Sequence, residues 1–217
     1  MTAPIIETDG RAIVLDLGIG AMLGGRPVAG LDVDVLGALI DKAMADAGTR
    51  FAFGRWAEPR ELYANDSFAS DGGEMRTIHM GIDLFCAAGT PVHAPLDGVV
   101  EVVANNEGAL DYGPLVILRH EASGFFTLYG HLSLDTLDEI AAGQPVRAGE
   151  RIARVGAPPC NGNWPPHLHF QLINDLKGLG AGFPGVAPAS SREDWLRLSP
   201  SGARFFPEID SKLLEYS

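Results

Sequence analysis

Two apolar segments of the chain carry histidine, RTIHMGIDLF at residues 76–85 and HLHFQLI at residues 167–173. Side chains alternate between the two faces of a β-strand, so residues two or four positions apart point the same way. If each segment is a strand, His79 shares a face with Asp83, and His167 shares a face with His169. The two segments therefore predict strands that gather imidazole and carboxylate groups on one face.

Further apolar stretches alternate with turn residues. They are rich in Val, Ile, Leu and Phe, each is bounded by Gly, Pro, Asn or Asp, and together with 77–85 and 167–173 they comprise 98–104, 114–119, 125–130 and 151–155. Short strands joined by turns at fairly regular intervals predict an antiparallel sheet folded on itself. With 27 Gly and 15 Pro against 20% charged residues, the composition favours a mainly β fold over a helical bundle.

The two flanks of this β-rich region have a different pattern. Apolar residues recur at three- and four-residue spacing over about 31–48, which predicts one amphipathic helix capped by Asp32 or Asp34. A short hairpin around Asp9-Gly10 is expected within residues 5–17. We therefore expect three regions: a small mixed α/β N-terminal extension at 1–70, a core at 71–175, and a loop-rich C-terminal tail at 176–217.

The charge of the chain excludes some classes of partner. Its formal net charge is -12 at pH 7, and it contains no polybasic run. Binding to nucleic acid or anionic lipid is driven by Lys and Arg, so neither is an expected partner. The sequence shows no convincing signal peptide and no run of the roughly 20 apolar residues that a membrane helix needs. We therefore expect a cytoplasmic location by default, with secretion or a periplasmic location left open and the oligomeric state undetermined.

Two cysteines are too few for a disulfide framework and form no CxxC pair. For Cys86 and Cys160 we expect two buried thiols, with a bridge between them as the alternative. Two histidines outside the motifs, His93 and His120, are expected to be satisfied core residues rather than ligands.

The other four histidines lie in three compact motifs, HMGID at 79–83, YGH at 129–131 and HLH at 167–169. A catalytic zinc site uses three protein ligands, commonly imidazole or carboxylate, and leaves a fourth position open. Two histidines and Asp83 can supply these ligands. The remaining histidines can transfer protons or donate hydrogen bonds. The motifs therefore predict a hydrolytic metal site.

These motifs resemble the lysostaphin-type zinc metallopeptidases, whose catalytic core carries an HxxxD and an HxH motif. The resemblance covers about residues 73–175 and includes GTPV at 89–92, APLDGVV at 94–100 and GQPVRAGERIARVG at 143–156. It implies an antiparallel β-sandwich-like core with a duplicated hybrid motif. It also implies that Zn²⁺ is bound by His79, Asp83 and His169, and that His131 and His167 are the catalytic pair.

By this resemblance the chain is expected to be a zinc metalloendopeptidase that hydrolyses peptidoglycan-like or glycine-containing peptides through a zinc-activated water. The division of acid and base roles between His131 and His167 stays open, and oxyanion stabilisation is an alternative role. The sequence departs from the family pattern at Asn163-Trp164-Pro165-Pro166, where Ser or Thr followed by Gly is common, and at Gln171, where Glu is frequent. Both departures are expected to alter the substrate groove.

Three other functions share some of these sequence features. Two histidines and one carboxylate also describe the iron site of non-haem oxygenases, and ligand identity does not separate the two metals. A biotinyl or lipoyl carrier is excluded because no lysine lies between residues 95 and 150. The last alternative is a metal-binding but non-catalytic or auto-occluded regulatory module of the same fold.

Overall fold

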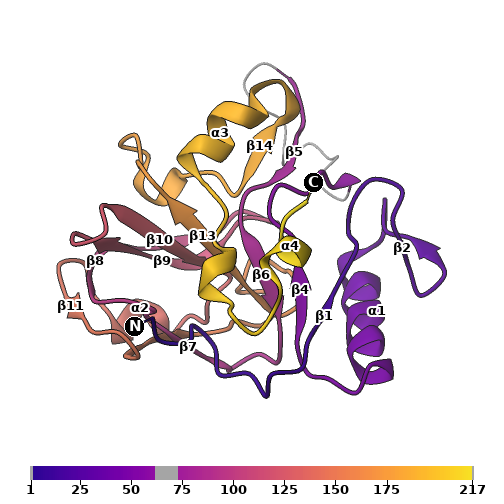
Figure 1. Cartoon of the computed structure of the whole chain (residues 1–217), viewed down its shortest axis with the longest axis horizontal. Coiled ribbons are helices and arrows are strands. Elements are labelled where there is room, and N and C mark those ends of the chain that lie inside the picture. The colour runs from indigo at the N-terminus through magenta and orange to yellow at the C-terminus, as the bar shows by residue number, and fades with distance from the viewer. Residues whose placement is uncertain (1, 62–72, 217) are drawn as a thin grey trace.

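The centre of the molecule is an eight-stranded sheet. The computed structural model describes residues 2–61 and 73–216. In spatial order, the strands of this sheet are β1 (Ile13–Val14), β4 (Ala52–Gly54), β6 (Ile82–Phe85), β13 (His167–Ile173), β10 (Phe125–Gly130), β9 (Gly113–His120), β8 (Gly98–Asn106) and β11 (Pro145–Val146). Neighbouring strands are antiparallel except for β1 and β4, which run parallel. The prediction of a mainly β, antiparallel fold is confirmed (Figure 1).

Smaller sheets and short helices surround the central sheet. The small sheets pair β2 (Met22–Leu23) with β3 (Arg26–Pro27), β5 (Arg76–His79) with β14 (Val186–Pro188), and β7 (Pro91–His93) with β12 (Arg151–Arg154). The α-helices are α1 (Val33–Asp46), α2 (Thr136–Glu139), α3 (Arg192–Leu198) and α4 (Ser211–Leu214), and short 3₁₀ helices span Gly180–Gly182, Ala189–Ser191 and Ala203–Phe205. Among the described residues, no helix has the length and apolar character needed to cross a lipid bilayer.

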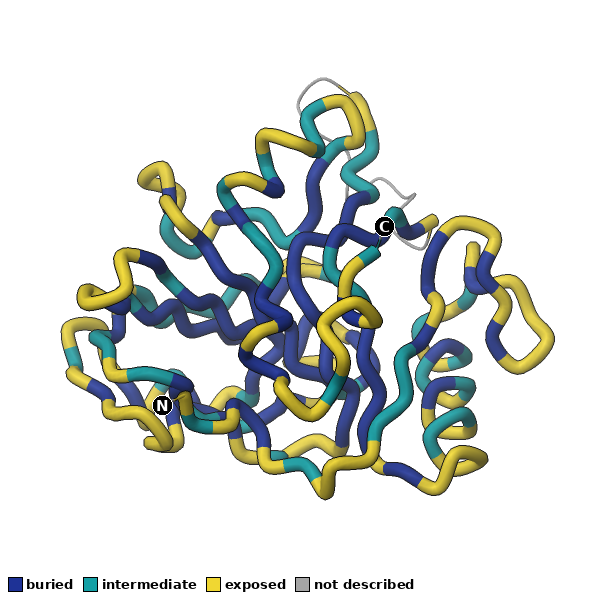
Figure 2. Tube along the Cα trace, viewed as in Figure 1, coloured by how far each residue is buried: buried dark blue, intermediate teal, exposed yellow. Residues whose placement is uncertain are grey.

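Both faces of the central sheet are covered by apolar side chains. In β9, Val116 and Leu118 belong to one buried cluster, which includes Phe170. Leu115 and Ile117 belong to a second cluster on the opposite face, as the alternation of side chains along a strand requires. Figure 2 shows the strands of the central sheet largely in the colour of buried residues. The sheet is thus a packed frame, and side chains at the ends of its strands are held in fixed positions.

Each of the six predicted strand segments contains strand structure, but residues 77–85 do not form one continuous strand. They form β5 and β6, which belong to different sheets. Gly81 lies between them, where a Cβ would approach Cε1 of His169 to 2.5 Å. The prediction that His79 and Asp83 share one face of a single strand is therefore wrong. The chain bends at the glycine instead, and the bend leaves room for the imidazole.

The N-terminal extension carries the predicted helix and adds two strands to the central sheet. Helix α1 begins after Asp32, whose carboxylate accepts a 2.9 Å hydrogen bond from the backbone N–H of Asp34. The predicted hairpin around Asp9-Gly10 is wrong, because β1 pairs in parallel with β4. The segment before β1 buries Ile5 and Ile6 in the core instead of folding back on itself.

The C-terminal tail has more regular structure than the sequence predicts. It supplies β14, α3 and α4, and its side chains Phe205 and Phe206 are buried in the core. Its end returns to the N-terminal extension, where the backbone N–H of Trp56 donates to the carbonyl of Leu214 at 2.9 Å. The expected boundary near residue 70 lies outside the described residues, so the division into three regions stays a prediction.

Candidate metal centre and groove

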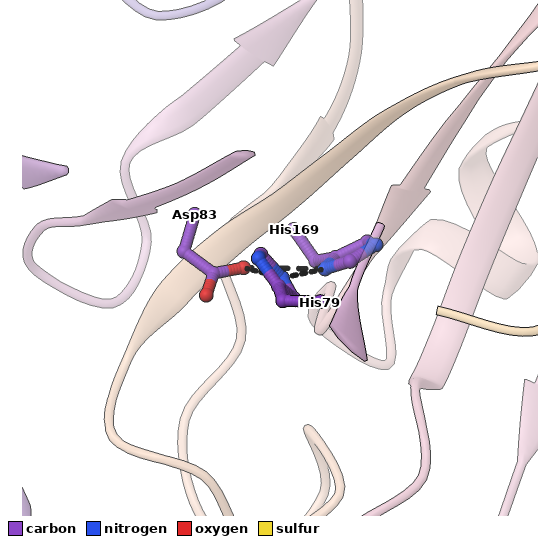
Figure 3. Close-up of side chains that lie close together, drawn as sticks. All are labelled: His79, Asp83 and His169. Atoms are coloured by element: carbon purple, nitrogen blue, oxygen red, sulfur yellow. Dashed lines mark hydrogen bonds and ion pairs between the residues drawn. The ribbon is translucent and has the colours of Figure 1, made fainter. Parts of the chain in front are cut away.

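Three of the predicted site residues bring one donor atom each to a common point (Figure 3). His79 ends β5, Asp83 lies in β6, and His169 lies directly opposite Asp83 in β13. Oδ1 of the aspartate lies 3.1 Å from His79 Nε2 and 3.2 Å from His169 Nδ1, and the two nitrogens are 3.1 Å apart. The exposed fraction of each residue is 3% or less. The antiparallel pairing of β6 with β13 therefore builds a buried triangle of donor atoms.

The dimensions of this triangle fit a tetrahedral metal ion. Zinc bonds to imidazole nitrogen and carboxylate oxygen are about 2.0–2.2 Å long, so neighbouring ligand atoms of a tetrahedral site lie about 3.3–3.6 Å apart. The observed separations of 3.1–3.2 Å come close to that edge length. Burying two imidazole nitrogens and a carboxylate oxygen against each other without a cation would also be unfavourable. The donor set suits zinc, as it also suits other first-row metals.

Each histidine of the triangle is oriented by a hydrogen bond from its other ring nitrogen. His79 Nδ1 donates to the carbonyl oxygen of Arg55 at 2.8 Å, and His169 Nε2 donates to Oε1 of Gln171 at 2.9 Å. Because these oxygens only accept, the proton lies on the outer nitrogen and the lone pair faces the triangle. Gln171, noted in the sequence as a departure from the family pattern, therefore orients a histidine of the cluster.

His131 and His167 lie beside the triangle, with their ring centroids 4.3 Å apart. His131 Nδ1 donates to the carbonyl oxygen of Asn161 at 2.9 Å, and His167 Nδ1 donates to that of Pro165 at 2.7 Å. This leaves Nε2 of both rings as the proton acceptor. His167 Nε2 is 3.7 Å from Oδ1 of Asp83. The structure thus places a pair of proton-accepting imidazoles next to the donor cluster.

Burial sets the protonation states in this cluster. It lowers the pKa of His131 well below its usual value, an effect that His167 reinforces, and it also lowers the pKa of His167 itself. Burial likewise lowers the pKa of His79 to about 4. Burial alone would raise the pKa of Asp83, but His79 and Arg60 beside it hold that pKa well below its usual value. At neutral pH these histidines are therefore uncharged and the aspartate is ionised.

We expect the metal-free protein to lose stability as the pH falls below neutrality. Folding lowers the pKa of His79 and His131, whereas a histidine of the unfolded chain titrates near about 6.5. Below that pH the unfolded chain binds more protons, so the free energy of unfolding falls by up to about 1.4 kcal/mol per pH unit for each buried histidine. Urea unfolding of chelator-treated protein between about pH 7.5 and 5.5 measures the slope. A flat profile would contradict the prediction.

Charged groups that no sequence motif predicts hold Asp83 in place. Arg60 Nη1 donates to Oδ2 of Asp83 at 2.7 Å, and Arg60 Nε donates to Oε2 of Glu58 at 2.8 Å. The only signal in the sequence is that charged residues interrupt a mostly apolar segment around residues 51–63. The partners Arg60 and Asp83 are separated by 23 positions, and no periodic pattern links them.

A cavity of about 310 Å³ lies against the donor cluster. Besides the site residues, those that line it include Leu17 and Leu36 of the N-terminal extension, Leu110 and Tyr112 just before β9, Trp164, and Phe183 of the tail. Its volume lies at the lower end of the range of about 300–1,000 Å³ that is typical of ligand sites. The flanks of the chain, as well as its β-rich core, therefore form the walls of this groove.

The remaining histidines and the cysteines lie outside the groove. His120 is a satisfied core residue, since its ring nitrogens bond to Asp97 O at 2.9 Å and Thr127 Oγ1 at 2.8 Å. His93 is only partly buried. The expectation of two buried thiols is wrong: Cys86 is buried, but Cys160 is exposed in the turn before Asn161, and both are free. Burial raises the pKa of Cys86 to about 11, so this thiol is not activated.

Several known proteins are similar in sequence to part of this chain. An uncharacterized metalloprotease of Haemophilus influenzae is 43% identical over 94 residues, covering 43% of this chain and 18% of that protein. An L-Ala–D-Glu endopeptidase of Bacillus subtilis is 30% identical over 132 residues, covering 56% and 39%. A peptidoglycan DD-endopeptidase of Vibrio cholerae is 34% identical over 114 residues, covering 52% and 24%. The chain thus spans less than half the length of these relatives.

These relatives give no support to the default expectation of a cytoplasmic location, since one of them is named for an action on peptidoglycan. The model of peptidase family M23 matches residues 77–179. This segment contains His79, Asp83, His131, His167 and His169, all of which the structure brings together at one groove. The resemblance to the lysostaphin-type metallopeptidases is therefore confirmed over residues 77–179, the segment that matches the model of peptidase family M23.

Proposed function

We propose that this protein is a zinc-dependent endopeptidase that hydrolyses peptide bonds in peptidoglycan or in glycine-containing peptides of similar shape. The observation that carries the proposal is the triangle of His79, Asp83 and His169 donor atoms, 3.1–3.2 Å on each side, next to two neutral histidines. The family match and the endopeptidase names of two relatives support it.

In this proposal His79, Asp83 and His169 hold the metal ion. When bound, zinc lowers the pKa of a coordinated water toward about 7 and polarises the scissile carbonyl. His131 and His167 handle the protons. Each presents an unprotonated Nε2, so one of them accepts the proton of the attacking water, and a proton is then delivered to the leaving amine. The imidazolium formed on the way can also stabilise the oxyanion.

The same ligand set could hold iron, but the neighbouring groups favour hydrolysis. Two neutral imidazoles with a free Nε2 beside the donor triangle supply the proton transfers that peptide hydrolysis requires. The groove is also walled by apolar side chains such as Leu17, Leu36 and Trp164, which suit an extended peptide. Peptidoglycan lies outside the cytoplasmic membrane, so this substrate implies that the protein acts there.

Zinc-loaded protein is expected to cleave purified muropeptides or glycine-rich peptides at a single type of peptide bond. Mass spectrometry of the products identifies that bond, because hydrolysis adds one water and separates the two fragments. Chelator-treated protein is expected to give no products, and restoring zinc should restore cleavage. Activity measured in air and under nitrogen should be the same, because zinc has no redox chemistry.

A control variant tests whether loss of a histidine outside the groove affects cleavage. His93→Ala removes one imidazole from β7, outside the residues that line the groove, and is expected to retain cleavage. If the wild-type protein binds one zinc ion and cleaves none of these substrates, the peptidase proposal is wrong for them. That result would instead favour a metal-binding regulatory module of the same fold.

A further inference from the structure

Two buried charged residues of the N-terminal extension are linked to the donor cluster through Asp83. Arg60 and Glu58 precede the segment that matches the family model, which begins at residue 77. The arginine side chain bridges two carboxylates, with Nη1 on Oδ2 of Asp83 at 2.7 Å and Nε on Oε2 of Glu58 at 2.8 Å. The exposed fractions of the Arg60, Asp83 and Glu58 side chains are 2%, 2% and 0%. The three therefore form a dry chain of alternating charges.

This arrangement is fixed at both ends. Besides the arginine, Glu58 accepts hydrogen bonds on Oε1 from Arg55 Nε at 2.9 Å and from the backbone N–H of Leu17 at 3.2 Å. The backbone N–H of Arg60 donates to the carbonyl of Thr77 at 2.8 Å. A buried ion pair contributes little net stability, because desolvation offsets most of the Coulomb attraction. Its rigid geometry suits it better to orienting a neighbour than to stabilising the fold.

The neighbour that it orients is Asp83. With Oδ2 occupied by the guanidinium, only Oδ1 faces His79 and His169. We propose that Arg60, locked by Glu58, is a positioning residue that presents a single oxygen of Asp83 to the metal. This inference rests on the proposed function, because it assumes that the triangle binds zinc. It extends the site to a part of the chain that lies outside the family match.

Gly54 supplies independent evidence for this role. It is paired with Asp83 across β4 and β6. A Cβ at this position would lie 2.6 Å from Arg60 Nη2 and 3.3 Å from Oδ2 of Asp83. The guanidinium is held by two carboxylates in a buried space, so it cannot move aside freely. The close approach of arginine to the metal-binding aspartate therefore requires glycine at position 54.

The first test measures zinc affinity by competition with a chromogenic chelator. Arg60→Lys keeps the positive charge, but a single ammonium cannot span both carboxylates as the guanidinium fork does. The double variant Glu58→Gln with Arg60→Met removes the charged pair, and the new glutamine can still accept from Leu17. Loss of a group that orients a metal ligand weakens metal binding by about 10- to 100-fold. We expect a loss of zinc affinity in this range for the Arg60→Lys variant and for the double variant. The visible spectrum of Co²⁺-substituted protein should change with it.

The second test uses the glycine. Gly54→Ala is expected to weaken zinc binding in the same direction by displacing the guanidinium. Gly37→Ala is its control: it adds the same methyl group on α1, where the nearest atom is 3.4 Å away, and it should leave zinc affinity unchanged. Arg119→Met is the control for loss of an arginine, because it breaks a surface pair with Glu101 far from the groove. Circular dichroism confirms that each variant is folded.

The outcomes separate the two proposals. Wild-type zinc affinity and an unchanged Co²⁺ spectrum in folded Arg60→Lys and in the double variant would overturn the positioning role, while leaving the proposed function intact. Retained affinity in Arg60→Lys alone would show that charge is sufficient and would overturn the two-point bridge. A wild-type protein that binds no zinc would overturn the proposed function together with this inference.

Discussion

Replacing His169 with alanine is expected to abolish zinc binding and peptide cleavage together. Its Nδ1 lies 3.2 Å from Oδ1 of Asp83 and 3.1 Å from Nε2 of His79, so the variant removes one corner of the donor triangle. Loss of a group that only orients a ligand weakens metal binding by about 10- to 100-fold, and loss of the ligand itself should weaken it more. Zinc content after dialysis, measured by mass spectrometry, and cleavage of the identified peptide are the two readouts.

The control for this variant is again His93→Ala, which should retain both zinc and cleavage. Near-ultraviolet circular dichroism distinguishes a folded metal-free protein from an unfolded one. A folded His169→Ala protein that still holds one zinc ion would remove His169 from the ligand set, and the metal would then have to be held by other groups of the groove.

The strands and the histidine motifs are predictable because they depend on local patterns. In HLHF the alternation of side chains puts His167 and His169 on one face, and both line the groove in the structure. Strand β13 also reads as a buried strand, since apolar residues fill the intervening positions. The two-residue spacing of these histidines does not determine which strand lies opposite β13, however. That the two histidines meet Asp83 depends on the pairing register of β13 with β6.

The convergence of His79 with Asp83 could be expected, but its geometry could not. An unbroken strand over residues 77–85 satisfies the apolar pattern equally well. The break arises because His169 occupies the space above Gly81, and this contact joins positions that are far apart in the sequence. A glycine within an apolar strand pattern is the one local signal of such a close approach. The pattern alone does not say what approaches it.

The contact of Arg60 and Glu58 with the donor cluster could not be predicted from the sequence, for a related reason. Arg60 and Glu58 bear no periodic relation to the histidine motifs, and a charged residue in a sequence is usually exposed. Their burial follows from the tertiary pairing of Gly54 in β4 with Asp83 in β6. The hydrogen bond from the backbone N–H of Trp56 to the carbonyl of Leu214 is a further long-range contact of this kind. Charge patterns indicate which partners a surface disfavours, but not which charges a fold will bury.

Replacing His131 with alanine is expected to lower kcat by about 10²–10⁴-fold while zinc stays bound, because general acid–base catalysis contributes an effect of that size. Its ring centroid lies 6.1 Å from that of His169 and 4.3 Å from that of His167, so it can exchange protons beside the triangle without belonging to it. Parallel measurements of zinc content, kcat and KM on folded protein test this. Loss of zinc in the variant would make His131 a ligand, and an unchanged kcat would leave His167 as the sole proton carrier.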